Sequence, residues 1–271
     1  MKALFAACGL ASALVAGTAI AQTAPPNETG VTMGHLHLNS RDAEVNKKIF
    51  VGMGGEALNV AGTPLQYVRF PGVIVIVNLP PGAPPEAGPS EGTVINHVGF
   101  LVPNVQDAVA KWKAAGVPVL PGNNGRLDQA YVNTPDGLRV EVLEDKDQKV
   151  PIKFHHVHFF VPEDQITKIQ TWYGKNFGAK PGMRGTNQAA DVPGANLTFS
   201  KTDQPTVPTK GRILDHIGFD VIDIEAAAQR FKENGIAIDR GIETSASGTK
   251  LLFIHDPWGT NIEVNQRPKP M

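Results

Sequence analysis

The sequence predicts an α+β protein built from four similar units, each a strand, a helix and then about three strands. A histidine opens four short apolar stretches at nearly equal spacings along the chain. The chain also holds 28 glycines and 22 prolines, a content that favours many short strands and turns over a helical bundle. The four stretches are His35-Leu-His-Leu, His97-Val-Gly-Phe, His156-Val-His-Phe and His216-Ile-Gly-Phe.

The second and fourth units align most closely, which supports the repeat. In both, a helix-capping residue follows the histidine at the same offset, a helical stretch comes next, and a glycine ends it. An aromatic residue, Trp112 or Phe231, is expected on the apolar face of each helix. In chain order the parts are Asn104, 105–115 and Gly116 in the second unit, and Asp223, 224–234 and Gly235 in the fourth.

The first and third units are looser copies of the same pattern. Helices are predicted over 42–51 and 163–176, and strands over 66–70, 73–79 and 196–200. Matching Pro-x-Gly turns, at Pro135 and Pro257, lead into last strands that carry Glu141 and Glu263. We therefore predict two domains, residues 31–148 and 149–267, divided in the charged stretch 144–149.

The N-terminus has the pattern of a secretory signal. A lysine precedes an apolar run, and small residues follow up to Ala21. We interpret residues 1–21 as a signal peptide cleaved after Ala21 and 22–30 as a linker, which predicts a periplasmic or secreted protein. Cys8, the one cysteine, would leave with the signal, so that the mature chain has no disulfide and no thiolate ligand.

Charge and hydropathy limit the partners. The formal net charge is −1 and the basic residues are dispersed, which argues against nucleic-acid binding. No later segment is long and apolar enough to span a membrane, so no membrane association is expected after signal cleavage. The expected partner is a small-molecule substrate, and the chain is expected to be a monomer or a homodimer.

The histidines and glutamates have the composition of a metal site. Taken as two halves, the chain offers two histidines and one carboxylate in each, which is a ligand set for a divalent metal with open coordination positions. The first half supplies His35, His97 and Glu141, and the second half supplies His156, His216 and Glu263.

Over residues 31–266 these motifs resemble the vicinal oxygen chelate superfamily, which includes glyoxalases, bleomycin-resistance proteins and extradiol dioxygenases. The resemblance implies four βαβββ modules forming two tandem glyoxalase-like half-barrel domains. It also implies that the six residues above are ligands of one or two divalent metal ions, with Fe, Mn, Ni, Co and Zn all suited to them.

Four further residues are candidates for catalytic roles. His37 and His158 lie two positions after a ligand histidine, so strand alternation turns each toward the same side as that ligand. They are candidates for extra ligands, hydrogen-bond partners of ligands or a general base, and packing is the alternative. Tyr131 stands where the dioxygenase branch has a tyrosine. Arg139 is expected either to hold an anionic substrate or to pair with Glu141.

The resemblance implies a divalent-metal-dependent, glyoxalase-like enzyme of the lyase or isomerase type, and the N-terminal signal pattern predicts that it is exported. Its substrate would be a small oxygenated molecule that chelates the metal. Strands 73–79 and 196–200 lack the extra glutamate of glyoxalase I, and no histidine shortly precedes His97 or His216, where extradiol enzymes carry one. The sequence thus departs from both branches, and a ring-cleaving dioxygenase remains an alternative. A second alternative is a metal-free binding protein of the bleomycin-resistance type with relic sites.

Overall fold

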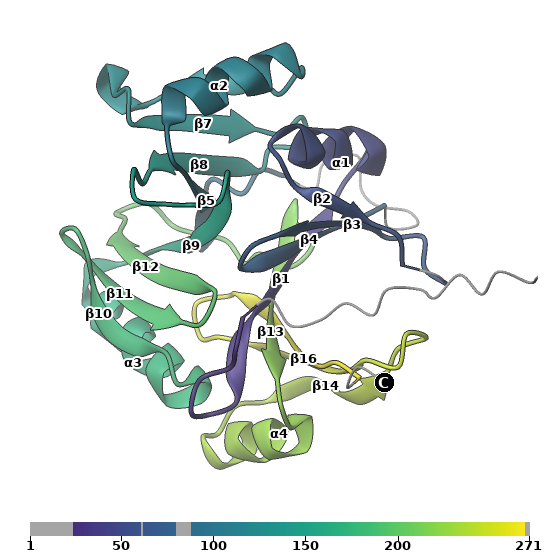
Figure 1. Ribbon diagram of the computed structural model, residues 1–271. Coiled ribbons are helices and arrows are strands. Elements are labelled where there is room, and N and C mark those ends of the chain that lie inside the picture. The colour runs from purple at the N-terminus through teal and green to yellow at the C-terminus, as the bar shows by residue number, and fades with distance from the viewer. Residues whose placement is uncertain (1–23, 61, 80–87, 269–271) are drawn as a thin grey trace, which may run out of the picture.

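The computed structural model describes residues 24–60, 62–79 and 88–268 (Figure 1). The predicted signal peptide, 1–21, lies outside the described residues. Among the described helices, none has the length and apolar character needed to cross a membrane.

The described chain contains four βαβββ modules, as the sequence predicted. Module one comprises β1 (Val31–Asn39), α1 (Ala43–Gly52), β2 (Glu56–Leu58), β3 (Gln66–Phe70) and β4 (Val73–Asn78). Module two comprises β5 (Ile95–Val102), α2 (Val105–Ala114), β6 (Val119–Pro121), β7 (Gln129–Asn133) and β8 (Arg139–Glu144), with the short 3-10 turn Asn123–Gly125 before β7.

The second half repeats this order. Module three comprises β9 (Lys153–Val161), α3 (Ile166–Phe177), β10 (Lys180–Arg184), β11 (Asn187–Val192) and β12 (Ala195–Lys201). Module four comprises β13 (Leu214–Val221), α4 (Ile224–Glu233), β14 (Ile238–Thr244), β15 (Lys250–His255) and β16 (Asn261–Gln266).

Helix capping follows the repeat in three modules and differs in the third. Asp42, Asn104 and Asp223 each accept a hydrogen bond from a first-turn backbone N–H, which satisfies one donor of the helix end. In module three a 3-10 turn, Glu163–Gln165, precedes α3, and Gln165 forms no side-chain cap. A glutamate is a poor N-cap, so this helix begins later than the pattern predicted.

The modules pair in an order that the sequence did not reveal. β1 pairs with β13 and β5 pairs with β9, both antiparallel, giving two eight-stranded sheets. We call them the outer-module sheet (β1–β4 and β13–β16) and the inner-module sheet (β5–β12). In Figure 1 the purple strand β1 lies against the light green β13, although the two come from opposite ends of the described chain. Each sheet thus takes one module from each predicted half.

The two sheets are joined by aromatic contacts and by a hydrogen bond. Phe100 of β5 contacts Phe70 of β3 at 4.8 Å and Phe154 of β9 at 5.3 Å between ring centroids, so that one apolar core is continuous between the sheets. Trp112 of α2 donates a hydrogen bond to the Met53 carbonyl, just after α1, at 3.1 Å. Trp112 and Phe231 are both buried, as predicted.

Modules three and four are linked by a buried polar contact. The Tyr173 hydroxyl of α3 donates to Asp256 Oδ2 at 2.9 Å, and Asp256 also accepts from the backbone N–H groups of Trp258 and Thr260. Burial raises the pKa of Asp256 and raises that of Tyr173 well above 10. This contact fixes the turn that leads into β16, the strand that carries Glu263.

Removing that hydroxyl should loosen the contact. Tyr173→Phe is expected to lower the free energy of unfolding by about 1–3 kcal/mol, because a buried hydrogen bond to a carboxyl group is lost. Denaturant unfolding measures the change. Lys175→Gln, an exposed change on the same helix, is the control and should stay within about 0.5 kcal/mol. Equal stability of the Tyr173 and Lys175 variants would contradict the role of this bond.

Candidate metal centre

Sterics explain why the second and fourth histidine motifs contain a glycine. The His35 ring lies across Gly218, and the His156 ring lies across Gly99, so closely that a Cβ at either glycine would clash with the ring. His35 is opposite Gly218 in the β1–β13 register, and Gly99 is opposite His156 in the β5–β9 register. A histidine on one central strand thus requires a glycine on its partner, which explains the His-x-Gly-Phe pattern.

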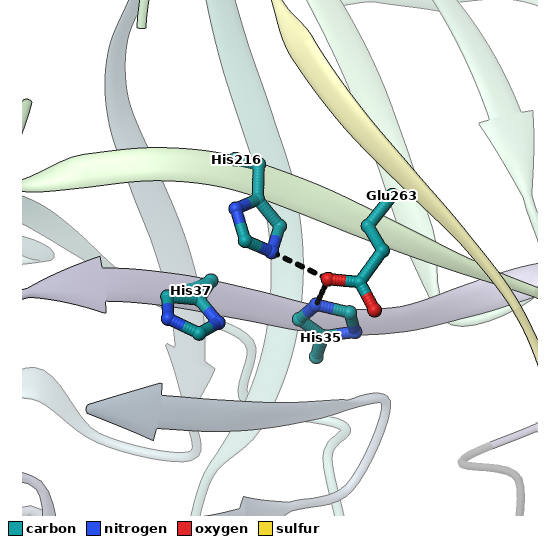
Figure 2. A group of neighbouring side chains, drawn as sticks. All are labelled: His35, His37, His216 and Glu263. Atoms are coloured by element: carbon teal, nitrogen blue, oxygen red, sulfur yellow. Dashed lines mark ion pairs between the residues drawn. The ribbon is translucent and has the colours of Figure 1, made fainter. Parts of the chain in front are cut away.

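The outer-module sheet brings together His35, His216 and Glu263 (Figure 2). Glu263 Oε2 lies 2.8 Å from His216 Nε2 and 3.7 Å from His35 Nε2. His37 joins the group, with its ring stacked on that of His216 at 4.4 Å between centroids. Four ligand atoms, one from each residue, lie within 4.8 Å of one another.

The grouping of ligands by sequence halves is therefore wrong. His35, from the first half, meets His216 and Glu263 of the second half. In the inner-module sheet, His156 meets His97 and Glu141, whose carboxylate lies 3.2 Å from His156 Nε2 and 3.6 Å from His97 Nε2. The equal spacing of the motifs fits a pairing of modules one with two and three with four, and it also fits the observed pairing of one with four and two with three. The hydrogen-bonded strand partners show which pairing occurs.

The outer-module residues fit a metal ion. His35 Nε2 and His216 Nε2 are buried, and neither has a hydrogen-bond partner. The 2.8 Å approach of His216 Nε2 to Glu263 has the length of a hydrogen bond but not its alignment. Buried nitrogens without partners are costly, and a metal placed between these nitrogens and the carboxylate would satisfy them all.

The Nδ1 atoms of His216 and His35 contact residues on the side away from the site. His216 Nδ1 donates to Asp215 Oδ1 at 2.6 Å, which leaves Nε2 to face the site. His35 Nδ1 lies 3.3 Å from Asn265 Nδ2, and the Asn265 Oδ1 has no partner. With the amide turned by 180°, His35 Nδ1 would donate to Oδ1 and its Nε2 lone pair would face the site.

Electrostatics favour a cation there. Burial raises the pKa of Glu263, but the His216 and His35 rings outweigh burial and hold this pKa well below its usual range. Burial lowers the pKa of His35, and it lowers that of His37 to about 3, so both rings are neutral near pH 7. For His216, Asp215 and Glu263 together outweigh burial and raise the pKa to about 9. A metal would replace the proton that this ring carries.

Two of the three inner-module histidines contact one another. His97, His156 and His158 lie close enough together to hold a metal, and His156 Nε2 is buried without a hydrogen-bond partner. His97 Nδ1 donates to Asn96 Oδ1 at 2.9 Å, so His97 Nε2 accepts, and His158 Nδ1 approaches it at 3.1 Å. Ser200 Oγ is 2.8 Å from the remaining nitrogen of His158. These contacts form a chain of donors and acceptors, Ser200 to His158 to His97 to Asn96. The nitrogen of His97 that would bind a metal is thus already used. Because His158 Nδ1 donates in this chain, it cannot accept from Arg184 Nη2, which lies 3.4 Å away.

An arginine that the sequence analysis missed completes the inner-module group. Arg184, at the end of β10, places Nη1 3.3 Å from His156 Nδ1 and 3.9 Å from Glu141 Oε2. Because a guanidinium only donates, His156 Nδ1 accepts, and the proton of this neutral ring lies on Nε2, toward Glu141. Burial, with Arg184 and the neighbouring histidines, lowers the pKa of His156 to about 3.

The two groups therefore differ in charge in two ways. The outer-module group contains the carboxylates Glu263 and Asp215. In the inner-module group Asn96 takes the place of Asp215, and Arg184 adds a positive charge beside Glu141. A divalent cation is attracted to the first group, whereas the second already holds a cation of its own.

Tyr131 and Arg139 lie beside the inner-module group but act on different partners. The Tyr131 hydroxyl lies 3.3 Å from Glu141 Oε1, which also accepts from Gln129 Nε2 at 2.5 Å. Arg139 pairs with Glu91 and covers the Tyr131 ring at 4.2 Å, so the expected pair with Glu141 is wrong. Gln129 was missed, although strand alternation puts it on the same side as Tyr131.

An apolar wall adjoins the outer-module group. Ile74 and Ile76 of β4 lie opposite His35 and His37 in register, and Tyr67 of β3 lies opposite Ile76. Because partners in register share a face, these side chains border the histidines. They form a small cluster of their own with Leu58, Val60 and Leu65. At the corresponding positions the inner-module sheet has Asn196 and Thr198, opposite His156 and His158.

The crowding at Gly218 gives a test of this arrangement. Gly218→Ala should displace the His35 ring and weaken metal binding by at least about tenfold, because ligand orientation is lost. Gly241→Ala, in the same sheet, meets nothing within 4 Å and should bind like the wild type. Titration with a divalent metal, alongside circular dichroism, measures both. Unchanged affinity in a folded Gly218 variant would exclude His35 as a ligand.

Comparisons with known proteins agree with this architecture. Residues 153–264 match the model of the family described as Glyoxalase/Bleomycin resistance protein/Dioxygenase superfamily. A search of curated proteins with the sequence finds no significant match.

Two solved structures extend the likeness to most of the chain. Glyoxalase I from Zea mays is similar with a TM-score of 0.65 and 18% identity, over 87% of this chain and 92% of that one. A Bacillus subtilis protein described as a "putative dioxygenase" is similar with a TM-score of 0.65 and 15% identity, over 92% of this chain and 87% of that one. At such identities the likeness shows the fold. Residues 153–264 therefore match the Glyoxalase/Bleomycin resistance protein/Dioxygenase superfamily, and most of the chain has the fold of tandem βαβββ modules that these two structures share.

Proposed function

We propose that the outer-module group binds one divalent metal ion and that the protein is a metal-dependent enzyme of the lyase or isomerase type. The observation that carries the proposal is the convergence of two buried, unpartnered imidazole nitrogens on the Glu263 carboxylate. Two histidines and one carboxylate leave coordination positions for a substrate with two neighbouring oxygens. The glyoxalase I fold match supports this class of reaction.

The residues around the group have separable tasks. A bound metal would act as a Lewis acid toward the substrate oxygens. Asp215 holds the His216 ring in place, and Gly218 leaves room for the His35 ring. His37 is neutral and stacked beside His216, within reach of the same space, so it is available either as a further ligand or as a proton acceptor.

The apolar wall favours a substrate with an apolar or aromatic arm. Tyr67, Ile74 and Ile76 would contact such an arm while the oxygens face the histidines. The same wall is the observation that keeps ring-cleaving dioxygenase chemistry, with iron or manganese, as the second candidate. Two histidines and a carboxylate are also the ligand set of many non-haem iron oxygenases.

We also propose that the mature protein acts outside the cytoplasm. The proposal rests on the N-terminal pattern of a lysine, an apolar run and small residues up to Ala21. N-terminal sequencing of the mature chain from its native host should begin at Gln22, and a mature chain that begins at Met1 would contradict export by cleavage.

Proton chemistry distinguishes the two enzymatic candidates. Hydroxyacetone carries two neighbouring oxygens, and the metal-loaded protein in D₂O should exchange its carbon-bound protons faster than the Glu263→Gln variant does. Proton NMR follows the exchange. Oxygen uptake with catechol, and no such exchange, would instead support the dioxygenase. A protein that takes up no metal and shows neither activity would overturn both in favour of a binding protein.

A His37→Gln variant separates the two roles of that residue. If His37 moves protons, metal content stays at the wild-type level and the exchange rate falls by about 10²–10⁴-fold. Loss of metal together with activity would identify His37 as a ligand. Lys47→Gln, outside the site, is the control for the same measurements and should change neither.

A further inference from the structure

We infer that the inner-module group is a binding site for a small organic carboxylate, centred on Arg184 and working without a metal. The outer-module proposal does not depend on this inference. It starts from a contrast between two groups built on similar modules. His97 Nε2 of the inner-module group contacts His158, whereas both imidazole nitrogens that face Glu263 are unpartnered. His156 Nε2 is unpartnered too, so the inference rests on the arginine that the inner-module group adds.

Arg184 lacks the partner that a guanidinium prefers. Its contacts are the Nδ1 atoms of His156 and His158, at 3.3 and 3.4 Å, and Glu141 Oε2 at 3.9 Å. All three distances are longer than the roughly 2.7–2.9 Å that is typical of a bidentate arginine–carboxylate pair. Arg184 Nε is buried and has no partner. The side chain keeps a fifth of its surface exposed, at 20%, so a ligand can reach it.

An open cavity gives access to this arginine. It has a volume of about 610 Å³, and Arg184, Lys153, His155 and Asn196 contribute polar groups to its lining. The one carboxylate in the lining, Asp191, already accepts from Asn196 Nδ2 at 2.7 Å. Burial, followed by Arg184 and Lys153, lowers the pKa of His155 to about 4, so His155 is neutral near pH 7. The cavity therefore offers Arg184 and neutral polar groups to an incoming anion, while Lys153 is paired with Asp145 at 3.6 Å.

The planar guanidinium of Arg184 favours a carboxylate as the ligand. A guanidinium is planar and presents paired donors that match the two oxygens of a carboxylate. Where the outer-module sheet has the apolar wall, the inner-module sheet has Asn196 and Thr198, so the bound molecule is expected to be polar along its length. The two sites would thus take different molecules.

Acetate and acetamide, which have nearly the same shape, provide the probes. Acetate should shift the imidazole NMR signals of the full mature protein, and neutral acetamide should not. Arg184→Gln should weaken acetate binding by about tenfold or more, because charge-assisted hydrogen bonds are lost. Arg69→Gln, which removes an exposed arginine paired with Glu56 in the outer-module sheet, should leave acetate binding unchanged. Arg184→Lys keeps the charge and should retain part of the affinity.

Three results would overturn the inference. One is equal acetate affinity in the wild type and in a folded Arg184→Gln variant. Another is a second equivalent of metal that His156→Ala removes, which would make the inner-module group a metal centre. The third is tighter binding of inorganic phosphate than of acetate at equal concentration, which would contradict the choice of a carboxylate. Metal binding in the outer-module group should be the same in the wild type and in Arg184→Gln. Absence of metal from the outer-module group would therefore contradict the proposed function and leave the inference about Arg184 unaffected.

Discussion

The antiparallel pairing of the first strand of one module with the first strand of another determines both sites. β1 meets β13, and β5 meets β9, so a histidine of one module faces a histidine and a last-strand glutamate of another. The pairing is close enough that a histidine ring lies over the partner strand, where only glycine leaves room for it. The residues of each group therefore come from both halves of the chain, and neither half alone contains a complete group.

A few substitutions give the two repeated sites different properties. Asp215 in the outer-module sheet corresponds to Asn96 in the inner-module sheet, which changes the charge beside the second histidine. Arg184 adds a cation to the inner-module group. The wall beside the histidines is apolar in the outer-module sheet, where it contains Ile74 and Ile76, and polar in the inner-module sheet, where it contains Asn196 and Thr198. The common backbone preserves the positions of the histidines, while these side chains determine which charge and which molecule each site favours.

The sequence predicted the local structure well because local structure depends on neighbouring residues. The four modules, the helix caps Asn104 and Asp223, and the last-strand positions of Glu141 and Glu263 were all predicted correctly. The pairing of modules could not be predicted, since equal motif spacing fits two arrangements and the choice depends on contacts between distant strands. Arg184 could not be found either, because it has no counterpart in the repeat and reaches the histidines only after β10 folds beside β11.

The central claim is that one metal binds where the first and fourth modules meet. Its most direct test is the metal content of purified mature protein compared with that of His35→Ala, Glu263→Gln and His97→Ala. We predict one equivalent in the wild type, loss of that equivalent in both the His35 and the Glu263 variants, and full retention in the His97 variant. Loss of metal on replacing His97, with retention on replacing His35, would contradict the account.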